Sequence, residues 1–233
     1  MPANFNSIVD AATLPYARTS RFAYHFARGK LRYDPVYRAI LENGLLPHEG
    51  RLIDLGCGLG ILSALLGEAR TQHQVGNFDE SPPLRNLKFH GVELLSWKVE
   101  AASQALGDRA TIHQGDIRTF KLPECSAVIL LDVLLYLNAA EQQKILQRIA
   151  STLQPGGILL LREADAAGDL RYYITNLAER ICCLWRGQGW PALHYRSKAE
   201  WIALLEESGF SVESLPMSQG TPFSNVLFRA TRI

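Results

Sequence analysis

The stretch Arg51–Gly60, RLIDLGCGLG, decides the fold of this chain. Its apolar first half is typical of a buried strand, and Gly56, Gly58 and Gly60 follow before a helical pattern begins near Ile61. Glycine lets a backbone approach a ligand closely, and the free amides at the start of a helix donate hydrogen bonds. The stretch therefore predicts a ligand-binding loop at the carboxyl end of a strand.

The charge and the spacing of this loop select among ligands. A dinucleotide-binding loop needs GxGxxG, whereas the glycines here are spaced GxGxG and Asp54 stands directly before the loop. A carboxylate at that place repels a pyrophosphate and attracts a ligand that carries a positively charged amino group and a sulfonium. The loop thus disfavours a nicotinamide-dependent oxidoreductase, which stays an alternative.

Outward from the loop, short apolar runs alternate with amphipathic helical segments. The runs HGVEL, ATIHQ, SAVILL and GILLLRE follow one another between residues 90 and 163. This alternation predicts an α/β fold with a doubly wound, mostly parallel sheet that is covered on both faces. Helices are also expected over 139–153, 169–185 and 197–208, and two late strands over 210–216 and 223–231 form a hairpin at a sheet edge.

Two segments stand outside this alternation. Residues 1–48 carry aromatic and basic side chains in a helical pattern and predict an N-terminal helical cap, which leaves 49–233 as the binding domain. Within that domain a lid over the acceptor is expected at about 165–196. Residues 71–88 are polar, contain Pro82 and Pro83, and predict an insertion loop.

Composition excludes several classes of function. The 233 residues are 47% hydrophobic with a formal net charge of +1, so the chain lacks the positive field that nucleic acid or an anionic membrane surface requires. The longest apolar stretch, 127–137, is shorter than the roughly 18 residues that cross a bilayer. The first residues lack the pattern of a secretory signal. We therefore expect a cytoplasmic protein in which Cys57, Cys125, Cys182 and Cys183 are reduced.

Three carboxylates follow the predicted strands. Glu93 ends the second strand, where it can accept hydrogen bonds from both hydroxyls of a ribose. Asp116 follows the third strand in HQGDI, where it can accept an adenine amino group. Asp132 interrupts an apolar run after the fourth strand and needs a partner in the crevice above the sheet. Each also has an explanation without a ligand. Glu93 can be a solvated residue at the end of a strand, and the two aspartates can cap helices.

These motifs, in this order, resemble those of class I S-adenosylmethionine-dependent methyltransferases: DLGCGLG at 54–60, GVE at 91–93, GD at 115–116, Asp132, and LQPGG at 153–157. The resemblance covers about residues 50–165. It implies a seven-stranded sheet of order 3-2-1-4-5-7-6 whose last strand is antiparallel. It also implies S-adenosyl-L-methionine as the cofactor and S-adenosyl-L-homocysteine as the product.

The resemblance further implies a role for each matching position. It places Asp54, Gly56, Cys57 and Gly58, with Gly60 of the same loop, around the methionyl part of the cofactor, Glu93 at the ribose, Leu94, Asp116 and Ile117 at the adenine, and Asp132 between cofactor and acceptor. The distance from Asp54 to Glu93 is longer than in most of this family because of the insertion at 71–88.

The base that a hydroxyl acceptor would need is not fixed by the motifs. Tyr136, His194 and Tyr195 are the candidates, with His25 in the cap as a further one, and ordinary packing or solvation also explains these histidines and tyrosines. Asp132 is a further catalytic candidate through its place between cofactor and acceptor. A metal-assisted site would need an Asp-Asn pair after the fifth strand, where this chain has Arg162 and Glu163. We therefore expect no metal.

The segment GKLRYDPVY, at 29–37, is weakly similar to bacterial methyltransferases that tailor polyketide-like or aryl-polyene pigments. This similarity implies O- or C-methylation of a small or medium aromatic or polyketide-like acceptor by a monomer or homodimer. In one version the acceptor is carried on an acyl carrier protein, whose acidic surface the basic cap would meet. A cofactor-binding regulatory partner without catalysis is the alternative.

Overall fold

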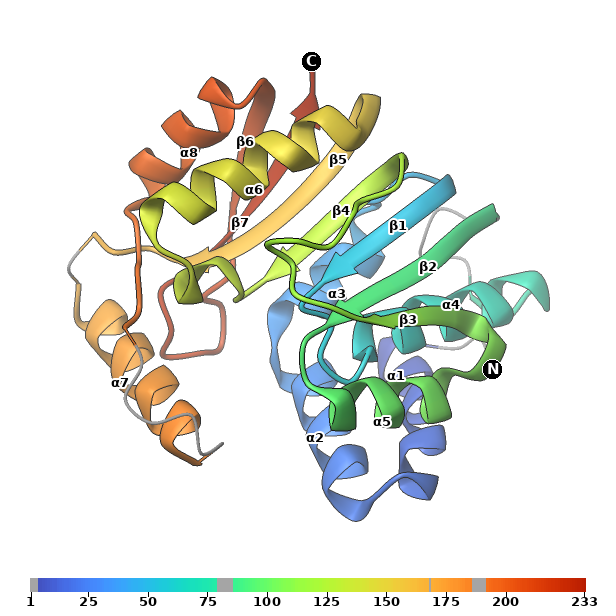
Figure 1. The fold of residues 1–233 in the computed structure, drawn as a ribbon. Coiled ribbons are helices and arrows are strands. Elements are labelled where there is room, and N and C mark those ends of the chain that lie inside the picture. The colour runs from blue at the N-terminus through green and yellow to red at the C-terminus, as the bar shows by residue number, and fades with distance from the viewer. Residues whose placement is uncertain (1–3, 79–85, 168, 186–191) are drawn as a thin grey trace. The chain divides into compact units, whose positions relative to one another are not determined.

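The computed structural model describes residues 4–78, 86–167, 169–185 and 192–233. The chain forms two compact units, Met1–Ile129 and Leu130–Ile233. Figure 1 shows the helices and strands of both. Among the described residues, no helix is both long enough and apolar enough to cross a membrane.

The first unit begins with helices and continues as alternating strands and helices. Its elements are α1 (Phe5–Thr13), η1 (Leu14–Arg18), α2 (Arg21–Tyr33), α3 (Pro35–Glu42), β1 (Glu49–Leu55), α4 (Ile61–Gln74), β2 (Asn86–Glu93), α5 (Ser96–Leu106), η2 (Gly107–Arg109), β3 (Ala110–Gln114) and β4 (Cys125–Leu131), whose last two residues belong to the second unit. The helical pattern predicted for residues 1–48 is confirmed by α1, η1, α2 and α3.

The strands of the first unit pair in parallel. β1 lies between β2 and β4, and β3 pairs with the other side of β2. Leu52, Ile53 and Leu55 of β1 are buried, as a central strand covered on both faces requires. Because the crossovers from β1 to β2 and from β2 to β3 run in the same direction, right-handed connections place α4 and α5 on the same face of the sheet, as Figure 1 shows.

Local sequence signals fix where the N-terminal helices begin. Asn4 forms a capping box with Ser7 at the start of α1, Ser20 caps α2, and Asp34 caps α3 ahead of Pro35. Helix α1 packs on α4. These caps and this packing hold the N-terminal helices against the helix that follows the glycine loop.

The described residues of the second unit form three strands of its own and three α-helices. Its elements are η3 (Leu134–Tyr136), α6 (Ala139–Thr152), β5 (Leu153–Ala164), α7 (Leu170–Trp185), α8 (Lys198–Glu207), β6 (Phe210–Pro216) and β7 (Asn225–Arg232). Strand β7 is antiparallel to both β5 and β6. The capping boxes of Asn138 with Glu141 and of Ser197 with Glu200 begin α6 and α8. The predicted late hairpin is confirmed.

The seven strands are ordered β3-β2-β1-β4-β5-β7-β6. This is the predicted order, and it confirms the α/β fold with a mostly parallel sheet. The boundary between a cap at 1–48 and a binding domain at 49–233 stays a prediction.

Two predicted boundaries were wrong. The insertion loop is shorter than 71–88, because α4 continues through Gln74 and β2 begins at Asn86, while residues 79–85 lie outside the described residues. In LQPGG the helix does not extend to 153: it ends at Thr152, and Pro155 lies inside the assigned β5. A proline drives the residue before it into extended backbone, so the strand begins ahead of the glycines.

Candidate functional site

The glycine loop of the first unit adopts left-handed backbone at all three glycines. The φ angles of Gly56, Gly58 and Gly60 are 77°, 59° and 68°, a region that other residues rarely enter. The amides of Gly56 and Cys57 donate to the Val92 carbonyl of the neighbouring β2 at 2.8 and 3.1 Å. The loop is therefore anchored to the sheet, and Gly60 serves as the N-cap of α4.

Space around the loop is tight on one side and open on the other. A Cβ atom at Gly60 would lie 2.6 Å from a methyl carbon of Leu106, and one at Gly91 would lie 2.6 Å from the Cys57 sulfur. A Cβ atom at Gly58 would meet no heavy atom of the described residues within 4 Å. The loop is thus packed from behind, while Gly58 faces room that a ligand can use.

The Tyr16 side chain ties the N-terminal helices to this loop. Its hydroxyl is buried and donates to the Leu59 carbonyl at 2.8 Å. A buried hydroxyl that finds a backbone carbonyl adds about 1 kcal/mol of stability and fixes the position of the carbonyl. The conformation of the loop therefore depends on a residue far upstream in the sequence.

Glu93 at the end of β2 is held in one orientation. One carboxylate oxygen accepts from the Gly58 amide at 3.0 Å, and the other accepts from the Leu95 amide at 3.0 Å. The Lys98 ammonium lies 3.8 Å away. Each oxygen keeps a further lone pair, so the oriented carboxylate can still accept hydrogen bonds from a ligand.

Asp54 at the end of β1 is a buried carboxyl group beside Glu93. Only 6% of its surface is exposed, and none of the described residues donates a hydrogen bond to its side chain. Burial and the neighbouring negative charge of Glu93 raise the pKa of Asp54 to about 7. A cation beside the two carboxylates would stabilise the ionised form of both. The geometry therefore fits the positively charged ligand that the sequence predicted.

Asp116 has a partner that the sequence analysis missed. Its carboxylate receives the Arg118 guanidinium, with Nε 3.0 and 2.9 Å from the two oxygens, and the Arg118 amide at 2.9 Å. These hydrogen bonds lower the pKa of Asp116. The Asp116 carbonyl accepts from the amides of Thr119 and Phe120, so Asp116 also holds a turn. Leu94 is exposed and Ile117 half-buried, and the adenine contacts stay a prediction.

In the second unit, Asp132 finds its partner within the protein rather than in a crevice. The buried Arg162 guanidinium contacts both of its carboxylate oxygens, and the Nε–Oδ1 distance is 2.9 Å. Asp132 has a φ of 59° and is the one non-glycine residue with positive φ among the described residues. The helix-cap reading is wrong, because Glu163 accepts from the following amides, those of Val133 and Leu134, at 3.2 and 2.7 Å.

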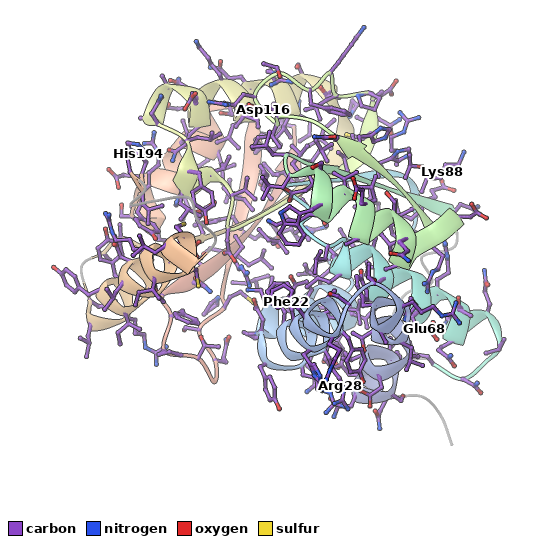
Figure 2. All side chains as sticks on the ribbon, turned by 60° about the horizontal axis from the view of Figure 1, so that its bottom comes forward. Phe22, Arg28, Glu68, Lys88, Asp116 and His194 are labelled. Carbon is purple, nitrogen blue, oxygen red and sulfur yellow. The ribbon has the colours of Figure 1, made fainter. Side chains whose placement is uncertain are left out.

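The candidate bases Tyr136 and His194 belong to connected segments of this unit. The His194 amide donates to the Leu135 carbonyl at 2.8 Å, and the buried Gln142 amide group donates to the His194 carbonyl at 2.9 Å. Figure 2 labels His194 on this segment. The Tyr136 hydroxyl donates to Glu179 of α7. His25 is exposed on α2, with its ring 5.2 Å from that of Tyr24.

The structure thus gathers the predicted residues into two clusters, one in each unit. Asp54, Cys57, Gly58 and Glu93 adjoin in the first, and Asp132, Tyr136 and the His194 backbone lie on connected segments of the second. Sequence reasoning missed the contributions of Arg162, Glu163 and Glu179. The charged pair Arg162-Glu163 at the end of the apolar run GILLLRE was a visible signal, because ionised residues in such a place need partners.

No group of three or more His, Cys, Asp or Glu side chains in the described part of the chain is arranged to hold a metal ion. Burial raises the pKa of the Cys57 thiol, with the charges of Asp54 and Glu93 adding to the effect. Cys57 is therefore a packed, protonated thiol within the loop rather than a nucleophile.

Comparison with known proteins finds a matching family model and similar relatives. A family model described as a methyltransferase domain matches residues 25–215. A carboxy-S-adenosyl-L-methionine synthase of Psychrobacter arcticus is 29% identical over 167 residues, which cover 70% of this chain and 58% of that protein. The chain thus matches little more than half of that relative's length.

Two solved structures share the fold. Magnesium protoporphyrin IX methyltransferase from Synechocystis PCC 6803, with bound S-adenosyl-L-homocysteine, aligns at a TM-score of 0.61 and 20% identity, covering 97% of this chain and 98% of that one. Human N-acetylserotonin methyltransferase in complex with S-adenosyl-L-methionine aligns at a TM-score of 0.62 and 17% identity, covering 100% and 60%.

Proposed function

This chain belongs to the methyltransferase-domain family, and from that premise we propose that it binds S-adenosyl-L-methionine and transfers the methyl group to a small organic acceptor. The observation that carries the proposal is the buried pair Asp54 and Glu93 beneath a glycine loop that is open at Gly58. S-adenosyl-L-methionine supplies a methyl group on a positively charged sulfur, and S-adenosyl-L-homocysteine remains after transfer.

Each residue of the first cluster has a role in holding the cofactor. Asp54 and the glycine loop from Gly56 to Gly60 receive the amino-acid part, because the ionised carboxylate attracts the ammonium group. Glu93 is oriented by two backbone amides and accepts the ribose hydroxyls with its remaining lone pairs. Leu94 flanks the adenine, and the Ile117 backbone binds its edge. Asp116 shares its carboxylate between Arg118 and the adenine amino group.

In the second cluster, Asp132 stands between cofactor and acceptor. Its ion pair with the buried Arg162 fixes the turn after β4, and Glu163 fixes the next two amides. A rigid turn places the groups that follow it, among them Tyr136, and the rate of an in-line displacement depends on such alignment. We assign the base to Tyr136 or His194, and the acceptor lid to residues 165–196, of which 168 and 186–191 lie outside the described residues.

The acceptor is an aromatic or polyketide-like compound that is methylated on oxygen or carbon. The tyrosines Tyr136, Tyr172 and Tyr195 of the second unit support an aromatic acceptor, since Tyr172 and Tyr195 pack edge to face with ring centres 5.4 Å apart. Acceptor delivery by an acyl carrier protein has less support, because the cap already pairs Arg28 and Arg32 with its own Asp10.

The relative from Psychrobacter arcticus favours a second candidate reaction. Its name, carboxy-S-adenosyl-L-methionine synthase, describes an enzyme whose product is a carboxylated form of the cofactor. In that case this chain would modify S-adenosyl-L-methionine itself rather than an external acceptor. The two reactions differ in which molecule gains mass.

Location and assembly complete the proposal. All four cysteines are free thiols, which suits a reducing compartment, and we place the protein in the cytoplasm as a monomer or homodimer.

Calorimetry followed by mass spectrometry tests the proposal. We expect S-adenosyl-L-homocysteine to bind and NADH not to bind. Asp54→Ala and Glu93→Ala should each weaken S-adenosyl-L-homocysteine binding by about 1–3 kcal/mol, the scale of charge-assisted hydrogen bonds. Glu207→Gln, at the exposed end of α8, is the matched control and should change nothing.

The same protein is then incubated with S-adenosyl-L-methionine and a panel of phenols, carboxylates and amines. A methylated member of the panel supports methyl transfer. A cofactor heavier by the mass of carbon dioxide, formed together with a panel carboxylate that has lost its carboxyl group, supports the second candidate. Binding with no product from any acceptor favours a regulatory partner. Unchanged affinity in both Asp54→Ala and Glu93→Ala refutes the site.

A further inference from the structure

Helix α7 turns its polar side inward and its apolar side outward. Its exposed large apolar side chains recur every three or four residues: Leu170, Tyr173, Leu177, Ile181 and Leu184. On the opposite side, at the same spacing, lie Tyr172, Asn176, Glu179 and Cys183. Cys183 is fully buried, which shows that this polar side faces the rest of the unit. A helix selected for stability alone buries its apolar stripe, so the inverted orientation needs another reason.

The inward side of α7 contacts the segment that follows β4. The Tyr136 hydroxyl donates a hydrogen bond to the Glu179 carboxylate. The Cys183 sulfur lies 3.8 Å from the Tyr136 oxygen and 3.9 Å from Glu179 Oε1. Tyr136 is 39% exposed, so part of the residue remains open to a second molecule. The side chains of α7 therefore hold a phenol that is hydrogen-bonded to a carboxylate and still partly exposed.

Tyr195 supplies a second polar group at the same place. Its ring packs edge to face on that of Tyr172, and its hydroxyl is buried with no hydrogen-bond partner in the described part of the chain. A buried hydroxyl without a partner is destabilising by about 1–3 kcal/mol, and a ligand with a polar atom would remove that penalty. Three features thus indicate a bound molecule. They are the inverted orientation of α7, the partly exposed phenol of Tyr136 and the buried hydroxyl of Tyr195.

We propose that Glu179 and Tyr136 act as a pair that takes the proton from a hydroxyl group of the acceptor. This inference rests on the proposed function. The acceptor's O–H proton passes to the Tyr136 oxygen while the Tyr136 proton passes to Glu179. The electron pair freed on the acceptor oxygen forms the bond to the methyl carbon, and the electrons of the breaking carbon–sulfur bond stay on the neutral sulfur of S-adenosyl-L-homocysteine. Tyr136 touches the acceptor, and Glu179 acts through Tyr136.

The pair also selects the class of acceptor. The Glu179 carboxylate, which accepts from Tyr136, disfavours a carboxylate ligand and leaves a neutral phenol, enol or alcohol unaffected. Burial raises the pKa of the nearby Glu163 to about 8, so Glu163 adds little negative charge at neutral pH. The other titratable or charged groups around the tyrosines are Cys183, Tyr172 and Arg180. Arg180 donates to Asn176 at 2.7 Å, and its positive charge also acts on Tyr195. The expected acceptor is therefore an uncharged hydroxyl compound.

A matched pair of probes tests the inference by binding and by fluorescence. The ligands are 2-naphthol and 2-naphthoate, which share a ring system and differ in charge, added to the protein with S-adenosyl-L-homocysteine bound. The wild type should bind 2-naphthol at least about tenfold more tightly than 2-naphthoate. Bound 2-naphthol, which releases its proton on excitation, should emit from its naphtholate form, because a proton acceptor lies beside it.

Glu179→Gln should bring the two affinities to within about threefold, because the repulsion of the carboxylate is gone. Both Glu179→Gln and Tyr136→Phe should shift emission of bound 2-naphthol to the neutral form. S-adenosyl-L-homocysteine affinity and the melting temperature should stay as in the wild type, and Glu207→Gln should match the wild type in every readout. A merely structural Glu179 would change the melting temperature and leave the emission alone.

The outcomes separate this inference from the proposed function. A wild type that binds no S-adenosyl-L-homocysteine refutes the proposed function. A wild type that binds S-adenosyl-L-homocysteine but binds no 2-naphthol, or prefers 2-naphthoate, overturns the inference alone. Unchanged selectivity and emission in Glu179→Gln also overturn it.

Discussion

Protonation of Asp54 should control cofactor affinity in the range from pH 6 to pH 8. The pKa of Asp54 is raised to about 7 by burial and by Glu93, so the carboxyl group is largely ionised at pH 8 and about one-tenth ionised at pH 6. Only the ionised form attracts the ammonium group of the cofactor. S-adenosyl-L-homocysteine should therefore bind about tenfold more weakly at pH 6 than at pH 8, a difference of about 1.4 kcal/mol.

Calorimetry at several pH values in buffers of different ionisation enthalpy measures this dependence. Binding at pH 6 should release close to one proton per site, and Asp54→Asn should bind weakly with an affinity that no longer varies over this range. A flat affinity in the wild type, or the same slope in Asp54→Asn, would contradict the electrostatic reasoning. Glu207→Gln should keep the wild-type slope.

The same group affects stability without ligand. The folded pKa of Asp54 lies above its ordinary value of 3.8, so the folded state binds the proton at a higher pH than the unfolded state. The ionised Asp54 carboxylate therefore destabilises the folded state. This effect is absent below about pH 4 and fully present above about pH 7. Asp54→Asn should therefore raise the melting temperature of the ligand-free protein at pH 8 and leave it unchanged near pH 4.

Two further substitutions test the packing and the ion pair. Gly91→Ala would place a Cβ atom 2.6 Å from the Cys57 sulfur and 2.7 Å from Ile112, so it should lower the free energy of unfolding by about 1–3 kcal/mol in a urea titration. An unchanged midpoint would contradict the close packing. Asp132→Ala leaves the buried Arg162 without its partner carboxylate and should cost about 3 kcal/mol, and Asp132→Ala with Arg162→Met should recover part of that loss. A double variant no more stable than Asp132→Ala would refute the pairing.

Much of the fold was predictable because its signals are local. The glycine loop needs left-handed backbone at Gly56, Gly58 and Gly60, and only glycine adopts that conformation without cost, so the sequence marks it directly. The starts of α6 and α8 carry Asn138 and Ser197, each with a glutamate three residues later, and these caps are visible in the sequence.

The missed parts depend on pairing between distant residues. Asp132 and Arg162 lie 30 residues apart, and nothing in the apolar run around Asp132 says which cation meets it. Glu163 accepts hydrogen bonds from the amides of Val133 and Leu134, whereas the Asp132 carboxylate is held by Arg162. The charge of Asp132 predicted that it has a partner. Which residue is the partner depends on how the strands pair in the sheet.

The orientation of α7 was likewise hidden from the sequence. Its helical period is plain, and an apolar stripe at that period normally predicts the buried side. In the structure the stripe is exposed and Glu179 faces inward to Tyr136. A functional constraint on the polar side explains why the usual pattern fails here, as such failures are expected to concentrate at functional sites.

The most direct test of the central claim is a crystal structure with S-adenosyl-L-homocysteine bound. The account predicts the ammonium group of the ligand within hydrogen-bonding distance of Asp54, and the ribose hydroxyls at Glu93. A ligand whose amino-acid part lies away from Asp54, or whose adenosine part occupies the glycine loop instead, would contradict it.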